Sequence, residues 1–119
     1  MSAESKKQRG QEGEDLAAQI VESGGLKILM RNFRCPVGEM DIIAAEGQSL
    51  VFIEVRTRSS AKFGWGEETI QAKKRMRLHR IAEYFLLSHH YKDWPPSRFD
   101  LIAIRWNEGN PQSKWIRGI

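Results

Sequence analysis

A hairpin of two apolar segments is the feature that most limits how this chain can fold. Residues 39–45 and 50–57 are each typical of a β-strand, and a two-residue turn at 47–48 joins them. One face of the hairpin then carries Met40, Ile42, Ala44, Val51, Ile53 and Val55. The other face is also apolar near the turn, where Ile43 is opposite Phe52. Strands that are apolar on both faces are typical of the centre of a sheet, so we expect this hairpin to be covered on both sides.

The rest of the chain alternates between helical and strand patterns. In chain order, the expected elements are a helix from Glu14 to the Gly24-Gly25 pair, strands at 26–33, 39–45 and 50–57, a loop at 58–67, a helix from about Glu68 to His89, a strand at 99–106 and a short strand at Trp115-Ile116. This order of helix, three strands, helix and strand predicts a mixed α/β domain whose helices cover a central sheet.

Length and composition suit one folded domain. The chain has 119 residues, of which 40% are hydrophobic and 29% are charged. We expect residues 1–13 to be a flexible polar tail and residues 14–119 to form a single domain. No apolar run is long enough to cross a membrane, and no signal peptide is expected. The single cysteine, Cys35, excludes an internal disulfide, so a reducing compartment such as the bacterial cytoplasm is expected.

Charged residues gather at the end of the hairpin that lies away from the turn. The turn places Asp41 opposite Glu54, and Glu39 opposite Arg56. Two carboxylates that close repel each other unless one takes up a proton or a cation lies between them. Mg²⁺ prefers oxygen ligands and often binds one or two carboxylates together with a phosphate. One interpretation is therefore a catalytic metal site, with Arg56 stabilising negative charge.

A structural interpretation of the same residues is equally open. Glu39 could pair with Arg56 across the two strands, because opposite charges often face each other in sheets. Asp41 and Glu54 would then lie at the rim of the sheet and form salt bridges with nearby arginines, namely Arg31, Arg34 or Arg58. The spacing of the residues alone does not decide between a metal site and these ion pairs.

Positive charge is concentrated in the second half of the chain. The net charge is +4, and residues 61–119 alone hold 11 basic and 6 acidic residues. Five basic residues fall within eight positions of the expected second helix: Lys73, Lys74, Arg75, Arg77 and Arg80. Lys73, Arg77 and Arg80 share one helix face, and such a row can follow the phosphates of a nucleic acid. The alternative is a solvated helix surface that binds no ligand.

The loop before that helix, residues 62–66, contains another candidate contact with nucleic acid. An exposed Trp65 could stack on an unpaired base, and the neighbouring glycines would allow the loop to move. The alternative is that Phe63 and Trp65 cover the core.

Two stretches of the hairpin carry a family resemblance. Residues 38–44, GEMDIIA, and 50–56, LVFIEVR, resemble motifs of the YraN-like family of predicted bacterial endonucleases. Further matching residues are Gly13-Glu14, Ala17, Asn32-Phe33-Arg34, Gly64, Ile70, Lys74, Arg77, Arg98-Phe99-Asp100 and Trp115-Ile116. That family belongs to the restriction-endonuclease-like, or PD-(D/E)xK, superfamily and is similar to archaeal Holliday-junction resolvases.

The resemblance implies a fold and a set of roles. The fold is a central mixed sheet flanked by helices. Asp41 and Glu54 match the two carboxylates that bind Mg²⁺ or Mn²⁺, and Glu14 matches an acidic residue that resolvases carry on the first helix. Arg56 stands where the superfamily usually has lysine. Arginine stays protonated, so it can stabilise charge but cannot act as a base. Glu39 is a further candidate to assist catalysis.

These observations favour a metal-dependent endonuclease that hydrolyses phosphodiester bonds in DNA, with branched or flapped DNA as candidate substrates. The expected contacts with nucleic acid are Lys73, Lys74, Arg77, Arg80 and Trp65. A homodimer would suit a resolvase, which cuts two strands, and no membrane contact is expected. Two alternatives stay open: a nucleic-acid-binding module that keeps the fold without efficient catalysis, and a structural or protein-interaction domain.

Overall fold

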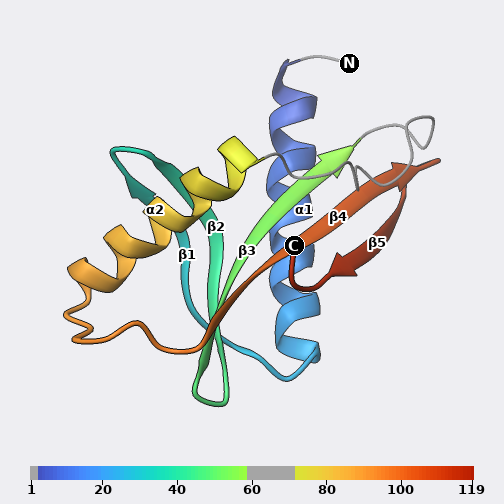
Figure 1. The fold of residues 1–119 in the computed structure, drawn as a ribbon. Coiled ribbons are helices and arrows are strands. Elements are labelled where there is room, and N and C mark those ends of the chain that lie inside the picture. Colours follow the sequence, from blue (N-terminus) through green and yellow to red (C-terminus); the bar gives the residue numbers. More distant parts are fainter. Residues whose placement is uncertain (1–2, 59–71) are drawn as a thin grey trace.

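A computed structural model describes residues 3–58 and 72–119 of the protein (Figure 1). Its elements are α1 (Ala3–Ser23), β1 (Lys27–Cys35), β2 (Gly38–Glu46), β3 (Ser49–Arg58), α2 (Ala72–Ser88), β4 (Ser97–Asn107) and β5 (Asn110–Ile116). The expected order of helix, three strands, helix and strand is confirmed, and β5 is a full strand in place of the short one expected. The expected loop at 58–67 lies outside the described residues except for Arg58, which ends β3.

The five strands form one mixed sheet in the order β1-β2-β3-β4-β5. Neighbouring strands are antiparallel except for β3 and β4, which are parallel. In Figure 1, α1 lies behind the sheet and α2 lies in front of it. The predicted fold class, a central mixed sheet flanked by helices, is therefore confirmed. Within the described part of the chain, no helix combines the length and the apolar character needed to cross a membrane.

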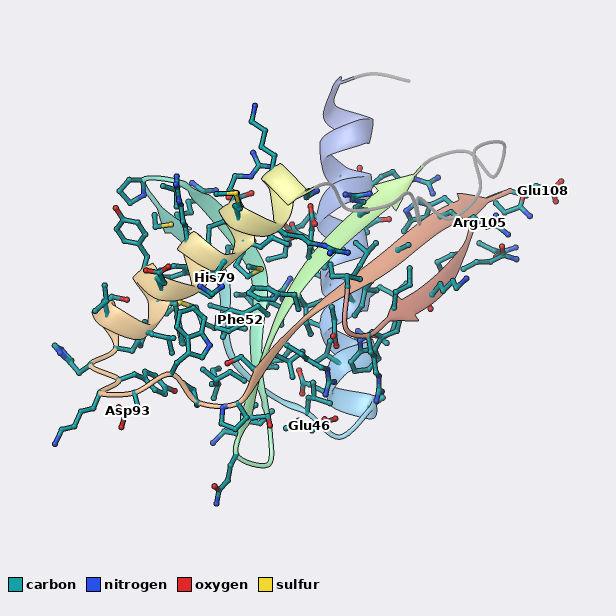
Figure 2. The ribbon with its side chains drawn as sticks, in the orientation of Figure 1. Glu46, Phe52, His79, Asp93, Arg105 and Glu108 are labelled. Carbon is teal, nitrogen blue, oxygen red and sulfur yellow. The ribbon has the colours of Figure 1, made fainter. Side chains whose placement is uncertain are left out.

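The β2–β3 hairpin has the register that the two-residue turn predicts. Glu46 pairs with Ser49, and the ladder continues to Ile42, which pairs with Ile53. Ile42 and Ile53 pack on the α1 side, whereas Phe52 packs beneath α2 (Figure 2). All three side chains are fully buried. The hairpin is therefore central and covered on both faces, as expected.

Met40 departs from the alternation expected along β2. The sequence places it on the face of Ile42, but it packs on the α2 side with Phe52. The reversal lies beside an irregular position of β1, because Asn32 has a φ of 55°. Asn32 falls between two residues of β1 that pair with Ile42 and Met40. A left-handed residue interrupts the regular pleat of a strand, and Asn32 lies beside the position where β2 departs from the alternation.

α1 begins at Ala3, well before Glu14, where the sequence analysis expected the first helix to start. The expectation of a tail at 1–13 relied on the lack of an apolar stripe there. Most of these residues are nevertheless good helix formers, such as Ala, Glu, Lys, Gln and Arg. The Gln8 side chain also donates a hydrogen bond to Glu12 one turn later. Helix propensity and such pairs extend the helix without any apolar face.

Gly13 allows α1 to approach β3 closely. A Cβ atom at this position would collide with the hydroxyl group of Thr57. At Gly10, on the same helix, a Cβ atom would meet no atom of the described residues within 4 Å. The close approach at Gly13 places the next residue of α1, Glu14, against the end of the β2–β3 hairpin.

We expect the Gly13→Ala variant to be less stable than the Gly10→Ala variant by about 1–3 kcal/mol, the usual cost of overpacking. Both substitutions replace a helical glycine with alanine and gain a similar helix propensity, so their difference isolates the contact with Thr57. Urea denaturation of the two variants measures this difference. Equal stabilities would show that α1 can shift away from Thr57 without cost.

Candidate active site

Asp41 lies where the two strands of the hairpin separate. The ladder between β2 and β3 extends only as far as Ile42 and Ile53. Just beyond it, the Val55 backbone N–H donates a hydrogen bond to Oδ2 of Asp41 at 2.7 Å. The Asp41 carboxylate thus accepts a hydrogen bond from a backbone N–H that, in a longer ladder, would have bonded to a main-chain carbonyl group. This contact holds Asp41 against β3.

Three carboxyl groups from three elements interact at this point. Glu14 of α1 and Glu54 of β3 are both near enough to Asp41 to act on its carboxyl group. Burial raises the pKa of Asp41 from its ordinary value of 3.8 to about 7, although the Val55 N–H opposes the rise. The nearby Glu14 and Glu54 carboxylates raise the pKa further. As expected for acidic groups this close, one of them tends to hold a proton.

The two oxygens of Glu54 have different surroundings. Oε1 accepts a hydrogen bond from Nζ of Lys74 at 2.6 Å, and Nε of Arg56 is 3.9 Å from the same oxygen. Oε2 is buried and has no hydrogen-bond partner among residues 3–58 and 72–119. A buried carboxylate oxygen without a partner is costly, so a further positive group or donor would stabilise it.

The carboxylates of Asp41 and Glu54 are oxygen donors of the kind that a divalent cation binds, but they do not form a complete cage. Within the described part of the chain, no group of three or more His, Cys, Asp or Glu side chains is arranged to hold a metal ion. Two features are nevertheless consistent with a cation: Oε2 of Glu54 has no partner within the described ranges, and the pKa of Asp41 is raised. Mg²⁺ commonly binds one or two carboxylates and completes its shell with water and phosphate oxygens.

Glu39 is not part of this cluster. Its side chain is exposed, and one of its oxygens lies 3.3 Å from Nε of Arg34 on β1. Arg31, also on β1, pairs with Asp15 of α1 at 2.7 Å. Two of the arginines considered as partners for the acidic pair therefore bind other carboxylates. Arg56 approaches Glu54, not Glu39 as the cross-strand interpretation supposed.

The basic residues of α2 border a groove beside the carboxylates. The groove has a volume of about 780 Å³ and is lined by Val37, Lys73, Lys74, Met76, Arg77 and Arg80. The four basic residues expected to contact nucleic acid therefore share one concave surface, which we call the basic groove. Lys74 belongs both to the basic groove and, through its bond to Glu54, to the acidic site. Trp65, the fifth expected contact, lies outside the described residues.

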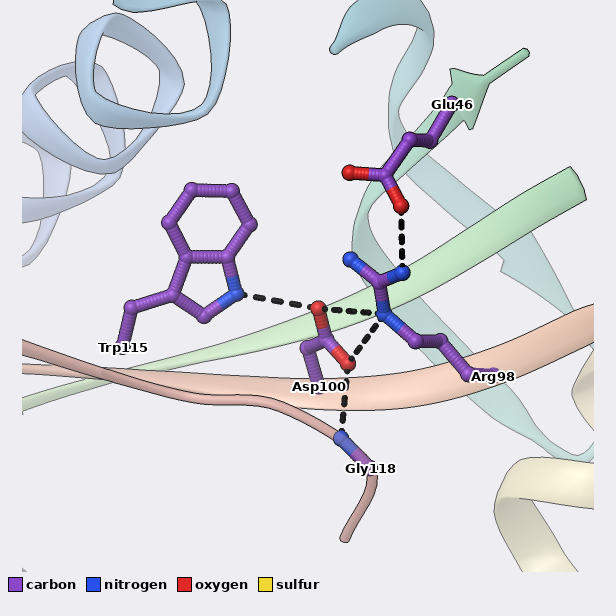
Figure 3. Close-up of polar contacts among 5 residues, drawn as sticks. All are labelled: Glu46, Arg98, Asp100, Trp115 and Gly118. Carbon is purple, nitrogen blue, oxygen red and sulfur yellow. Dashed lines mark hydrogen bonds and ion pairs between the residues drawn. The ribbon is translucent and has the colours of Figure 1, made fainter. Parts of the chain in front are cut away.

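A second polar cluster was not assigned a role from the sequence. Asp100 of β4 is fully buried and accepts hydrogen bonds from Nε of Arg98, from Nε1 of Trp115 at 2.9 Å and from the Gly118 N–H at 3.0 Å (Figure 3). Arg98 also contacts Glu46 at 2.6 Å. Both oxygens of Asp100 are satisfied, so this acid ties the C-terminal segment to the sheet. Arg98, Asp100 and Trp115 are among the residues that match the resembled family, and this match was the sequence signal that could have pointed to the cluster.

Comparison with known proteins finds a family match that covers most of the chain. Residues 13–104 match the model of the family described as "Uncharacterised protein family UPF0102". A UPF0102 protein of Desulfitobacterium hafniense (strain DSM 10664 / DCB-2) is 55% identical over 120 residues, covering 98% of this chain and 99% of the relative. A UPF0102 protein of Moorella thermoacetica is 48% identical over 99 residues, with coverage of 83% and 82%. One from Arthrobacter sp. (strain FB24) is 40% identical over 111 residues, with coverage of 92% and 93%. The carboxylates and the basic residues of α2 fall within the matched range.

Proposed function

Because the chain belongs to the UPF0102 family, whose name states no activity, we propose a function from the geometry of the site: a metal-dependent endonuclease acting on DNA. One observation carries the proposal. Asp41 is held against β3 beside Glu54 at the end of a buried hairpin, one buried oxygen of Glu54 has no partner among the residues that the structure describes, and Lys74 joins Glu54 to the basic groove. The resemblance to the restriction-endonuclease-like superfamily, with which the mixed sheet is compatible, supports the same reading.

Each residue of the acidic site would have a distinct role in hydrolysis. Asp41 and Glu54 would hold Mg²⁺ or Mn²⁺, which when bound polarises a phosphodiester and lowers the pKa of a bound water. Glu14, the third carboxyl group near Asp41, would assist the two metal ligands. Arg56 would stabilise negative charge that develops on the phosphate, and it cannot serve as a base because it stays protonated.

The basic groove would bind the backbone of the nucleic acid. Lys73, Arg77 and Arg80 project from one helix into the same concave surface. Phosphate contacts of this kind give affinity that falls as the salt concentration rises, and they carry little sequence information. The groove therefore suits a substrate recognised by its backbone and shape, which includes branched and flapped DNA.

The test is a cleavage panel. The purified protein and its Asp41→Asn variant are incubated with labelled duplex, single-stranded, flap and four-way-junction DNA, with Mg²⁺, Mn²⁺ or EDTA. We expect the parent alone to cut, and only with a divalent cation. Absence of cutting on every substrate would remove the proposed catalytic role. A resolvase activity would also need two active sites, so sedimentation with junction DNA should then detect a homodimer.

The main alternative is a nucleic-acid-binding module with the nuclease fold but without efficient catalysis. Arg56 favours this alternative, because it occupies the usual position of lysine in the resembled motif. Such a module would bind DNA in EDTA, would keep its affinity after Asp41→Asn, and would never cut. A structural or protein-interaction domain would bind neither DNA nor metal. The same panel, read for binding as well as cleavage, distinguishes all three.

A further inference from the structure

Lys74 makes the shortest contact between a positively charged group and the acidic site in the described part of the chain. Its Nζ is 2.6 Å from Oε1 of Glu54, and about three-quarters of each side chain is shielded from solvent, with 24% and 21% exposed. The pair links α2 to β3, across the face of the sheet that α2 covers. Buried carboxylates are costly without a compensating cation. In the metal-free protein Lys74 therefore supplies positive charge that a bound metal ion would otherwise supply.

Lys74 also borders the place where a phosphate would bind. It lines the basic groove together with Lys73, Arg77 and Arg80. A lysine side chain has a flexible four-carbon stem and a compact charge, so its ammonium group can change partners by rotating the side chain alone. Lys74 thus contacts Glu54 and also lines the basic groove. One short movement can thus transfer this charge from the carboxylate to the nucleic acid.

We propose that Lys74 competes with the metal ion for Glu54 and exchanges that carboxylate for a phosphate when the metal binds. The inference rests on the proposed metal site and adds a coupling between its two ligands. A divalent cation at Glu54 repels the ammonium group and releases it into the basic groove. A phosphate in the groove attracts Lys74 and leaves Glu54 free for the metal. Because coupling free energies are reciprocal, metal and DNA should each strengthen the binding of the other.

The test measures Mn²⁺ affinity without DNA. Calorimetric titration at fixed ionic strength compares the parent with Lys74→Gln, which removes the charge and keeps a polar side chain of similar length. Lys73→Gln is the matched control, because Lys73 lines the same groove and no bond joins it to Glu54 among the described contacts. We expect Lys74→Gln to bind Mn²⁺ at least about 5-fold more tightly than the parent does, which is within the usual range of coupling between two sites. Lys73→Gln should change the affinity by less than about 2-fold, since exposed charges interact weakly.

Two further measurements make the result decisive. Lys74→Arg keeps the positive charge and should restore parent-like Mn²⁺ affinity, which loss of a merely structural contact would not predict. Mn²⁺ should also strengthen binding of uncleaved DNA less in Lys74→Gln than in the parent. A Lys74→Gln variant that binds Mn²⁺ no more tightly than Lys73→Gln would overturn the exchange. If the parent binds no more Mn²⁺ than Asp41→Asn does, the proposed metal site itself fails, and the exchange fails with it.

Discussion

Asp41→Asn is expected to remove metal-dependent cleavage and, at the same time, to stabilise the metal-free protein at neutral pH. Cleavage should fall at least about 100-fold, because the variant loses a carboxylate of the metal site and the charge stabilisation that depends on it. Asparagine is nearly the same size and keeps an oxygen that can accept the hydrogen bond from Val55. The substitution therefore changes charge with little change in packing.

The gain in stability follows from the raised pKa of Asp41. The pKa is 3.8 in the reference state and about 7 in the folded protein, chiefly because the side chain is buried. Between these values the folded state holds a proton that the unfolded state has released, so stability falls as pH rises. The contribution is fully present below about pH 4 and is lost as pH rises through 7. At pH 8 the uncharged amide of the Asp41→Asn variant avoids this loss, and we expect a gain of about 1–3 kcal/mol.

Urea denaturation in EDTA at pH 5 and pH 8 measures this effect. The variant should exceed the parent clearly at pH 8 and by less at pH 5. Glu39→Gln is the matched control, because Glu39 is an exposed carboxylate on the same strand and pairs with Arg34 outside the cluster. That control should change neither cleavage nor the pH dependence. An Asp41→Asn variant that is less stable than the parent at pH 8 would contradict the electrostatic account of the site.

Asp100→Ala is expected to give the largest loss of stability, about 3–5 kcal/mol, which is typical when one partner of a buried charged network is removed. Arg98, the Trp115 ring N–H and the Gly118 N–H would all lose their acceptor. The melting temperature should fall by more than about 10 °C. Thermal unfolding followed by circular dichroism measures this change.

Glu46→Gln provides the comparison for Asp100→Ala. Glu46 contacts the same arginine from the outside, but its side chain is 40% exposed. Partly exposed ion pairs contribute up to about 1 kcal/mol, so this variant should be only slightly destabilised. Neither cost should depend on Mg²⁺, because the cluster is separate from the acidic site. Similar losses for both variants would mean that Asp100 is not the centre of the network.

The hairpin could be predicted from the sequence because its information is local. A two-residue turn fixes the register from Glu46–Ser49 to Ile42–Ile53. Asp41 and Glu54 come directly after the last pair, so the pairing expected for them is not part of the ladder, although the two residues are close. The contact between Lys74 and Glu54 could not be predicted this way. It joins a helix to a strand across a connecting segment, and helical periodicity shows only that Lys74 lies near a basic row. The placement of Glu14 came from the resemblance, since one acid early in a helix has many ordinary explanations.

The full lengths of α1 and β5 could not be predicted, for the same physical reason. The first half of α1 and most of β5 carry few apolar residues, and hydrophobic periodicity is the main signal for an element. α1 is extended by helix propensity, and β5 is held by pairing with β4 along its whole length. Neither effect leaves a periodic pattern. Elements that bury little side-chain surface are therefore the ones that the sequence analysis shortened.

The parallel pairing of β3 with β4 sets the order in which the site can assemble during folding. β2 and β3 are joined by a tight turn, and hairpins of this kind form within about 1–10 μs. Leu101 of β4 pairs with Glu54 of β3. The chain between these two residues must therefore close as one long loop before β4 can pair with β3. Lys74 lies inside that loop, on α2. We therefore expect Asp41 and Glu54 to become neighbours in the hairpin before Lys74 reaches them. During folding, the two carboxylates would then be close together before the ammonium group of Lys74 can compensate their charge.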